Sequence, residues 1–308
     1  MGWSTTNSSV WLLALAPLCA QAVEPHLFEA VEPHMGTLFS IKLYAETEQQ
    51  AKSAFRAAFD RVAQLDDILS DYKPESELNR VSSSAVHHPM KISGDLFRVL
   101  AASQSLAERS GGAFDVTVGP VTRMWREARR QKQYPDPDAL DAALAHCGYT
   151  KLHLDERART VLLDQDRMQL DVGGIAKGYA ADEALAVLKR LGIQRALVAA
   201  GGDLAFGGAW KIAIAASDSA VELNNAAVST SGDSEQYLEA NGKRYSHIVD
   251  PSTGIALTTS ITVSVVAPHG IVADGLATAI SVLGETAGRK LAKRYADVQV
   301  FVMAGVVR

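Results

Sequence analysis

The chain has 308 residues, of which 47% are hydrophobic and 21% charged, and its formal net charge is −5 at pH 7. This composition excludes a disordered chain, and the absence of a basic excess argues against a nucleic-acid partner. The length suits one large domain or two closely joined lobes, and two cysteines cannot make a disulfide scaffold.

The first 22 residues are predicted to be a secretory signal peptide. They carry no charge, their apolar run Val10–Cys19 is too short to cross a bilayer, and Ala20-Gln-Ala22 is a small-x-small cleavage pattern. The usual Lys or Arg near the start is missing, which leaves a disordered or buried N-terminal segment as the alternative. Leu18 fits poorly before a lipidated Cys19, so we favour cleavage after Ala22 over attachment to the inner membrane. Residues 23–308 would then form a single domain without a transmembrane span.

After the leader, the first half of the chain is expected to mix strands and helices. Apolar residues at helical spacing, such as Ala54, Ala58 and Val62, indicate an amphipathic helix over Glu48–Ile68. The other helices are predicted at about Gly94–Arg109, ending at Gly111-Gly112, and from Pro135 onward. Strands are predicted at Thr37–Tyr44, Lys151–Leu154, Thr160–Leu163 and Met168–Val172.

The second half continues the same mixture. Helices are predicted at Ile175–Leu191 and Val272–Leu283, and strands at Ala196–Ala199, Lys211–Ala215, Ala226–Ser231 and Ile261–Ala267. Strands outnumber helices and many are spaced as hairpins, which favours an α+β fold with largely antiparallel sheets. No GxGxxG follows a strand, so a Rossmann cofactor site has no support. Cys147 is expected to be a buried structural thiol.

The densest motif is Asp171-Val-Gly-Gly-Ile-Ala-Lys-Gly-Tyr-Ala-Ala-Asp182, where a predicted strand meets a helix through two glycines. Glycines let the backbone approach a ligand, and the N–H groups at a helix start favour an anion. Lys177 could add a point charge to a phosphate. The alternative is a tight turn with a solvated lysine.

Two further motifs offer oxygen ligands and a base. Asp274 and Thr278 are four residues apart on a predicted helix, so a carboxylate and a hydroxyl share one face and could bind Mg²⁺. His247 lies just before a Pro-Gly turn with Asp250 close in sequence, which suits a general base. Each pattern alone is common, and a structural histidine is the alternative for His247.

Two loops complete the set of candidate segments. Ser70–Asn79 is turn-rich and carries the aromatic Tyr72, and Gly111–Pro120 is a glycine loop predicted to lead into a strand. Either segment could be a mere connection, or the tyrosine could lie against a planar ring.

In this order, the clusters resemble the ApbE family of FAD:protein FMN transferases. The resemblance runs from Met35-Gly-Thr37 to Asp274–Thr278 and includes Gly201-Gly202-Asp203. It implies an α+β fold of two closely joined lobes of largely antiparallel sheets with packed helices, and a flavin cleft between the lobes. A secretory signal agrees with it, because these enzymes usually work outside the cytoplasmic membrane, and a periplasmic location is expected.

The resemblance also implies a set of site residues. The positions expected to line FAD are Met35, Tyr72, Ala113, Phe114, Asp115, Asp171, Lys177, His247 and Ile248. Mg²⁺ is expected on the carbonyl of Gly174 and the side chains of Asp274 and Thr278, and His247 is expected to be the catalytic base. Other members carry Ala or Thr at Gly174, and some carry an acid at Lys177.

The implied reaction is Mg²⁺-dependent transfer of the FMN moiety of FAD to a threonine or serine hydroxyl of an acceptor protein, with release of AMP. The implied acceptors belong to respiratory redox complexes: Na⁺-pumping quinone reductases, Rnf-type complexes or nitrous-oxide-reductase accessory proteins. Two alternatives stay open. One is a Mg²⁺-dependent FAD pyrophosphatase that releases FMN and AMP. The other is a non-catalytic periplasmic flavin-binding protein, against which the retained Asp274, Thr278 and His247 argue.

Overall fold

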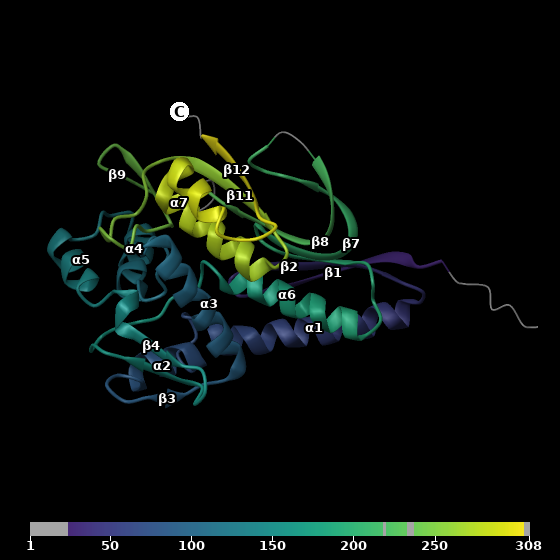
Figure 1. The fold of residues 1–308 in the computed structure, drawn as a ribbon, viewed down its shortest axis with the longest axis horizontal. Coiled ribbons are helices and arrows are strands. Elements are labelled where there is room, and N and C mark those ends of the chain that lie inside the picture. The colour runs from purple at the N-terminus through teal and green to yellow at the C-terminus, as the bar shows by residue number, and fades with distance from the viewer. Residues whose placement is uncertain (1–23, 218–219, 233–236, 305–308) are drawn as a thin grey trace, which may run out of the picture.

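The computed structural model describes residues 24–217, 220–232 and 237–304 (Figure 1). Its largest element is a seven-stranded sheet in the order β1-β2-β6-β7-β8-β11-β12, in which every neighbouring pair is antiparallel. These strands are β1 (His26–His34), β2 (Thr37–Ala45), β6 (Ala196–Ala200), β7 (Asp203–Ala213), β8 (Ala220–Ser231), β11 (Ile261–Ala267) and β12 (Gln299–Ala304). The predicted signal peptide lies outside the described residues, so the division into residues 1–22 and one domain over 23–308 stays a prediction.

Three long helices pack against the sheet, namely α1 (Glu48–Leu69), α6 (Ala176–Arg190) and α7 (Gly270–Ala292). Figure 1 shows them side by side along the sheet. Strand β2 explains the contact, because Phe39, Ile41 and Leu43 alternate with polar residues and are fully buried. Burial of this apolar face joins the helices and the sheet into one core.

Helix α7 is, among the described residues, the one helix long and apolar enough to cross a membrane. Half of its most apolar stretch is buried within the protein, where Leu276 and Ile280 belong to the main core. Its apolar surface is therefore used to cover strands β8 and β11.

A smaller lobe lies at one end of the sheet (Figure 1). It contains α2 (Glu77–Ser84), α3 (Gly94–Ser110), α4 (Gly119–Gln131), α5 (Pro137–Leu144), a 3₁₀ turn (Tyr149–Lys151), the sheet β3 (Met90–Lys91)-β5 (Thr160–Leu163)-β4 (Leu152–Asp155) and the hairpin of β9 (Tyr237–Ala240) and β10 (Lys243–Ser246). Trp125 is the centre of a second core here, and Cys147 lies in it. Burial raises the pKa of the Cys147 thiol to about 12, as fits the buried structural thiol expected from the sequence. The α+β fold with antiparallel sheets is confirmed.

Two local predictions were wrong. Met168–Val172 is extended but makes only an isolated bridge, between Gln169 and Val118, because its backbone bonds to loops and to the Ser82 hydroxyl. The loop after Gly111 leads into helix α4 and not into a strand. A Cβ on Gly119 would lie 2.4 Å from the carbonyl oxygen of Gln169, so glycine is needed where the helix starts.

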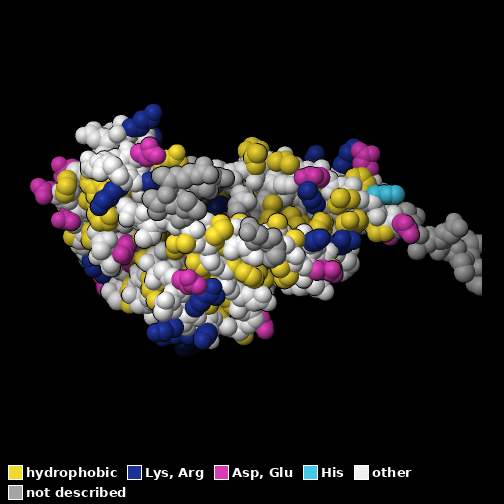
Figure 2. All heavy atoms as spheres, turned by 90° about the horizontal axis from the view of Figure 1, so that it is seen from above, with side chains coloured by type: hydrophobic (Ala, Val, Ile, Leu, Met, Phe, Trp, Pro, Cys, Tyr) yellow, Lys and Arg dark blue, Asp and Glu magenta, His cyan; other side chains and the backbone are white. Residues whose placement is uncertain are grey.

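Several elements had no counterpart in the predictions, and two strands are longer than expected. Those missed are β1, α2, β3, α4, β9, β10 and β12, and those extended are β7 and β8. On the face seen in Figure 2, Lys and Arg side chains lie in small groups interspersed with Asp and Glu.

Candidate functional site

Helices α6 and α7 cross at a contact between two glycines. A Cβ on Gly178 would lie 2.2 Å from the carbonyl oxygen of Gly270, and a Cβ on Gly270 would lie 2.4 Å from that of Gly178. Asp182 of α6 accepts hydrogen bonds from the N–H groups of Gly270 and Ile271, at 2.7 and 3.0 Å. In return, Asp274 of α7 accepts from the Gly178 N–H at 3.0 Å. Each carboxylate thus lies at the positive end of the other helix, and the crossing fixes Asp274 in place.

Asp274 belongs to a cluster of two buried carboxylates and one partly exposed ammonium. Lys177 Nζ lies 2.7 Å from Asp203 Oδ2 and 3.7 Å from Asp274 Oδ2, and the Ser229 hydroxyl donates to Asp203. Burial, and then repulsion from Asp203, raise the pKa of Asp274 above its ordinary value. Burial alone would lower the pKa of Lys177, but the two carboxylates outweigh it and raise that pKa. With both carboxylates ionised, the cluster carries one negative charge in excess.

Oxygen donors of other kinds lie next to this cluster. Thr278, one helical turn after Asp274, donates from its Oγ1 to the Gly174 carbonyl oxygen at 3.4 Å. No three His, Cys, Asp or Glu side chains gather in a metal-binding group within the described ranges. A carbonyl, a hydroxyl and a carboxylate are nevertheless ligands that Mg²⁺ accepts, and the excess negative charge favours a cation. The residues present therefore fit a hard divalent cation.

The Gly174 carbonyl belongs to the glycine turn Gly173-Gly174, which Asp171 anchors. Asp171 Oδ1 accepts from the Gly173 N–H at 2.9 Å. Its Oδ2 accepts from the Thr122 hydroxyl and from Arg126 Nη2, both at 2.7 Å. Arg126 also donates to Asp71, so one guanidinium of α4 joins two buried carboxylates from distant parts of the chain.

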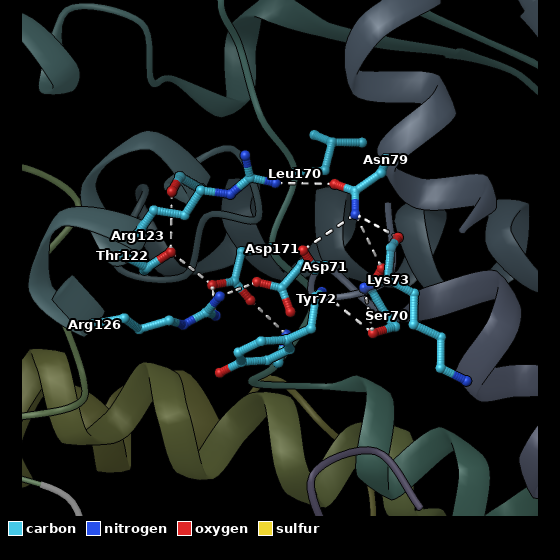
Figure 3. Close-up of polar contacts among 12 residues, drawn as sticks. Ser70, Asp71, Tyr72, Lys73, Asn79, Thr122, Arg123, Arg126, Leu170 and Asp171 are labelled. Carbon is cyan, nitrogen blue, oxygen red and sulfur yellow. Dashed lines mark hydrogen bonds and ion pairs between the residues drawn. The ribbon is translucent and has the colours of Figure 1, made fainter. Parts of the chain in front are cut away.

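The same guanidinium supports Tyr72. Arg126 Cζ lies 4.5 Å from the centre of the Tyr72 ring, and the tyrosine is 72% exposed. The turn that carries the ring is held by Asn79, whose Nδ2 donates to the carbonyls of Asp71 and Lys73 at 3.1 and 2.9 Å, while Arg123 donates to Asn79 Oδ1 at 2.9 Å (Figure 3). The ring is therefore fixed and accessible, as a stacking partner for a planar ligand should be.

The loop 111–118 is held by packing and by hydrogen bonds within the protein. Phe114 is buried, and its ring lies 3.3 Å from where a Cβ on Gly174 would be, so it packs on the glycine turn. Asp115 Oδ1 accepts from the N–H and hydroxyl of Thr117, both at 2.7 Å, and its Oδ2 accepts from the Tyr149 N–H at 2.8 Å. Burial raises the pKa of Asp115. Its carboxylate thus ties this loop to the turn before β4.

The loop with His247 follows strand β10. His247 is exposed and the next residue, Ile248, is buried. Trp125 of α4 donates from its indole to the Gly254 carbonyl at 2.9 Å, which anchors the loop to the second core. The Asp250 carboxylate accepts from the N–H and hydroxyl of Ser252, at 2.8 and 2.7 Å, and so closes the turn.

The contacts above bring together most of the site residues expected from the sequence. Those joined through the glycine turn, the α6–α7 crossing and Arg126 are Tyr72, Phe114, Asp171, Gly174, Lys177, Asp274 and Thr278. Ala113 and Asp115 flank Phe114, His247 and Ile248 lie on the loop after β10, and Met35 lies at the turn between β1 and β2 with φ of 49°.

Four supporting residues had no assigned role in the sequence-based site, namely Asp71, Thr122, Arg126 and Asp203. Asp71 and Asp203 lie inside the motifs Ser70–Tyr72 and Gly201–Asp203, so an acidic residue within a motif, without an assigned role, was the signal. Arg126 is one of four arginines within the eight positions 123–130, on a helix that was not predicted. Thr122 had no distinguishing signal.

The model of the ApbE family matches residues 35–302. The FAD:protein FMN transferase of Haemophilus influenzae is 34% identical over 312 residues, which cover 93% of this chain and 90% of that protein. That of Treponema pallidum is 32% identical, covering 81% and 77%. A mutant of the flavin transferase ApbE from Vibrio cholerae superposes with a TM-score of 0.82 at 29% identity, covering 92% of this chain and 95% of that one. The apo flavinyl transferase ApbE of Pseudomonas stutzeri gives 0.80 at 30% identity, covering 93% of each chain.

Proposed function

Because the chain belongs to the ApbE family and is a flavin transferase, we propose that it moves the FMN part of FAD onto a threonine or serine hydroxyl of an acceptor protein with the help of Mg²⁺. The observation that supports the Mg²⁺ dependence is the cluster of Asp203, Lys177 and Asp274, with both carboxylates buried, beside the Gly174 carbonyl and the Thr278 hydroxyl. It combines an excess negative charge with oxygen donors, which is the chemistry that a hard cation requires.

Gly174, Asp274 and Thr278 would hold the Mg²⁺, which when bound neutralises charge on a diphosphate. Lys177 adds a positive charge at the same place, and its pairing with Asp203 keeps the ammonium oriented. Tyr72 offers one face of its ring to a planar part of FAD, since Arg126 covers the other. The site thus positions FAD by a ring at one point and by charge at another.

In the reaction, the acceptor hydroxyl oxygen attacks the phosphorus on the FMN side of the diphosphate. The bond from that phosphorus to the bridging oxygen breaks, and AMP leaves with the bridging oxygen. His247 takes the proton of the hydroxyl, a contribution typically of about 10²–10⁴ in rate. Its exposed side chain on an anchored loop suits a substrate as large as a protein.

The experiment incubates residues 23–308 with FAD, Mg²⁺ and a purified acceptor domain, and follows the acceptor mass and free AMP. We expect AMP together with an acceptor heavier by one FMN. AMP with unlabelled acceptor and free FMN would establish the pyrophosphatase instead. Bound FAD without any AMP would leave a flavin-binding protein.

Two variants test the site. Asp274→Ala should abolish Mg²⁺-dependent turnover and also the rise in melting temperature that Mg²⁺ gives the wild type, because a principal ligand is lost. His247→Ala should keep FAD bound and lose about 10²-fold or more of the transfer rate. The exposed residues Asp138 and His88, changed to alanine, are the matched controls. Wild-type rates in either site variant would refute its assignment.

We further propose that the acceptor belongs to a respiratory redox complex and that the enzyme works in the periplasm. The leader pattern of residues 1–22 and the resemblance to exported transferases support this location. The acceptor would be one of the three classes that the resemblance implies: a Na⁺-pumping quinone reductase, an Rnf-type complex or a nitrous-oxide-reductase accessory protein. Transfer assays with one domain from each class distinguish them, and transfer to none of the three would contradict the proposal.

A further inference from the structure

A pocket of about 630 Å³ opens beside Tyr72 on helix α4. Four arginines of this helix line it, at positions 123, 126, 129 and 130, together with Asp71, Tyr72 and Glu127. With Asp171, which bonds to Arg126 from behind the lining, four positive charges thus face three negative ones, on a chain whose net charge is −5. Such a local excess, against the sign of the whole molecule, marks a place for an anionic partner.

The arginines differ in how far the fold already neutralises them. Arg126 is matched by Asp71 and Asp171, and Arg130 pairs with Glu127. Arg123 donates to the neutral amide of Asn79. The two arginines of the group without a carboxylate partner are therefore Arg123 and Arg129.

Arg129 stands out among them. Its Nη1 is buried and, within the part of the chain that the structure describes, has no hydrogen-bond partner. Burial, and then repulsion from Arg126, lower the pKa of Arg129. A buried N–H group of a charged side chain without a partner costs free energy, and an incoming carboxylate would remove that cost.

We propose that this pocket receives an acidic side chain of the acceptor protein, so that Arg129 helps to dock the substrate that takes up FMN. The inference rests on the proposed function, which requires a protein to come next to Tyr72 and the glycine turn. Tyr72 is 72% exposed, so the pocket is open to a partner from solvent. A carboxylate and the guanidinium can form two parallel hydrogen bonds, which would fix the orientation of the acceptor.

The FAD diphosphate is a poorer occupant. Asp171 lies between Arg126 and the glycine turn, since it bonds to Arg126 Nη2 and to the Gly173 N–H. Asp71 lies on the same guanidinium, and these two carboxylates repel a phosphate. A diphosphate finds its counter-charges at Lys177 and at a cation held by Asp274.

The test uses two synthetic peptides of equal length with a central threonine, one flanked by glutamates and the other by glutamines. Their binding to the protein loaded with FAD and Mg²⁺ is followed by fluorescence anisotropy at low salt. We expect the glutamate peptide to bind about tenfold more tightly to the wild type, and this preference to fall to about one in Arg129→Gln. Arg157→Gln, which removes an exposed arginine outside the pocket, should keep the preference.

Three readouts make the result decisive. The melting temperature of Arg129→Gln should be no lower than that of the wild type, because the change removes an unpartnered charge. Its affinity for FAD, measured by flavin fluorescence, should equal that of the wild type. Weaker binding of FAD and FMN, but not of riboflavin, would assign the pocket to a nucleotide phosphate and overturn the proposal. No glutamate preference in FAD-loaded wild type would overturn it as well. A wild type that binds no FAD would contradict the proposed function, and this inference with it.

Discussion

Arg126 shows how much of the site depends on one side chain. Its guanidinium bonds to Asp71 and Asp171 and lies against Tyr72, so it joins the stacking ring to the anchor of the glycine turn. Burial, and then repulsion from Asp171, raise the pKa of Asp71, while Arg126 acts to lower it. Two carboxylates thus share one positive charge in a poorly solvated place.

We expect Arg126→Gln to lower the free energy of unfolding by about 3 kcal/mol at pH 8, because both carboxylates lose their partner. The loss should be smaller at pH 5. An acid whose pKa is raised by folding holds its proton more tightly in the folded state, so its contribution to stability falls as the pH rises. Urea unfolding at the two pH values checks this, with the exposed pair of Arg130, tested as Arg130→Gln, as a control worth under about 1 kcal/mol. An equal loss at both pH values would contradict the expectation.

At the scale of elements, prediction succeeded where the pattern is local. Helices α1, α3 and α6 begin and end within about two residues of their predicted bounds, because apolar periodicity and cap residues such as Ser93 and Gly111 lie within the segment. Prediction failed where the conformation of a segment depends on contacts with residues distant in the sequence. Met168–Val172 alternates like a strand but has no neighbouring strand, and α4 follows β-branched residues that resemble one.

The crossing of α6 and α7 likewise could not be predicted from the sequence of either helix alone. Gly178→Ala should destabilise the protein by about 3 kcal/mol and weaken the stabilisation by Mg²⁺, because the new methyl group meets the Gly270 backbone and drives Asp274 away from α6. Urea unfolding and melting with Mg²⁺ measure the two effects. Gly94→Ala is the matched control, since a Cβ there meets nothing closer than 3.9 Å, and it should be neutral or slightly stabilising. A Gly178→Ala protein as stable as this control would refute the tight crossing.

For the whole molecule, the α+β class followed from the number and hairpin spacing of the strands, and the ordered motifs predicted a set of site residues. The residues that support that set were not predicted. Asp71 reaches Arg126, and Asp203 reaches Lys177, only in the folded chain, because the partners are 55 and 26 positions apart in the sequence. The distance between two residues along the sequence does not show whether they form an ion pair, because that depends on how the chain folds. The motifs therefore predict which groups meet a ligand, and the structure adds the residues that hold those groups in place.

The proposed export of the protein can be tested together with the state of its remaining cysteine. We expect the chain to be exported and cut after Ala22, which leaves Cys147 as its only cysteine. Since burial raises the pKa of that thiol to about 12, it should resist alkylation at pH 8 until the protein is unfolded. Cell fractionation with N-terminal sequencing and native labelling of the mature protein measure both points. A full-length cytoplasmic protein, or rapid native alkylation, would contradict them.

The α6–α7 crossing also determines when, during synthesis and folding, the proposed cation site can form. The proposed donors for the cation come from Gly174 and from Asp274 and Thr278, about a hundred positions later in the chain. A growing polypeptide therefore has no complete donor set until α7 has emerged and docked, and a chain kept unfolded for export never assembles one on the way. Flavin chemistry would then begin only after the protein has folded at its destination, and the FAD supply of the cytoplasm would be left untouched.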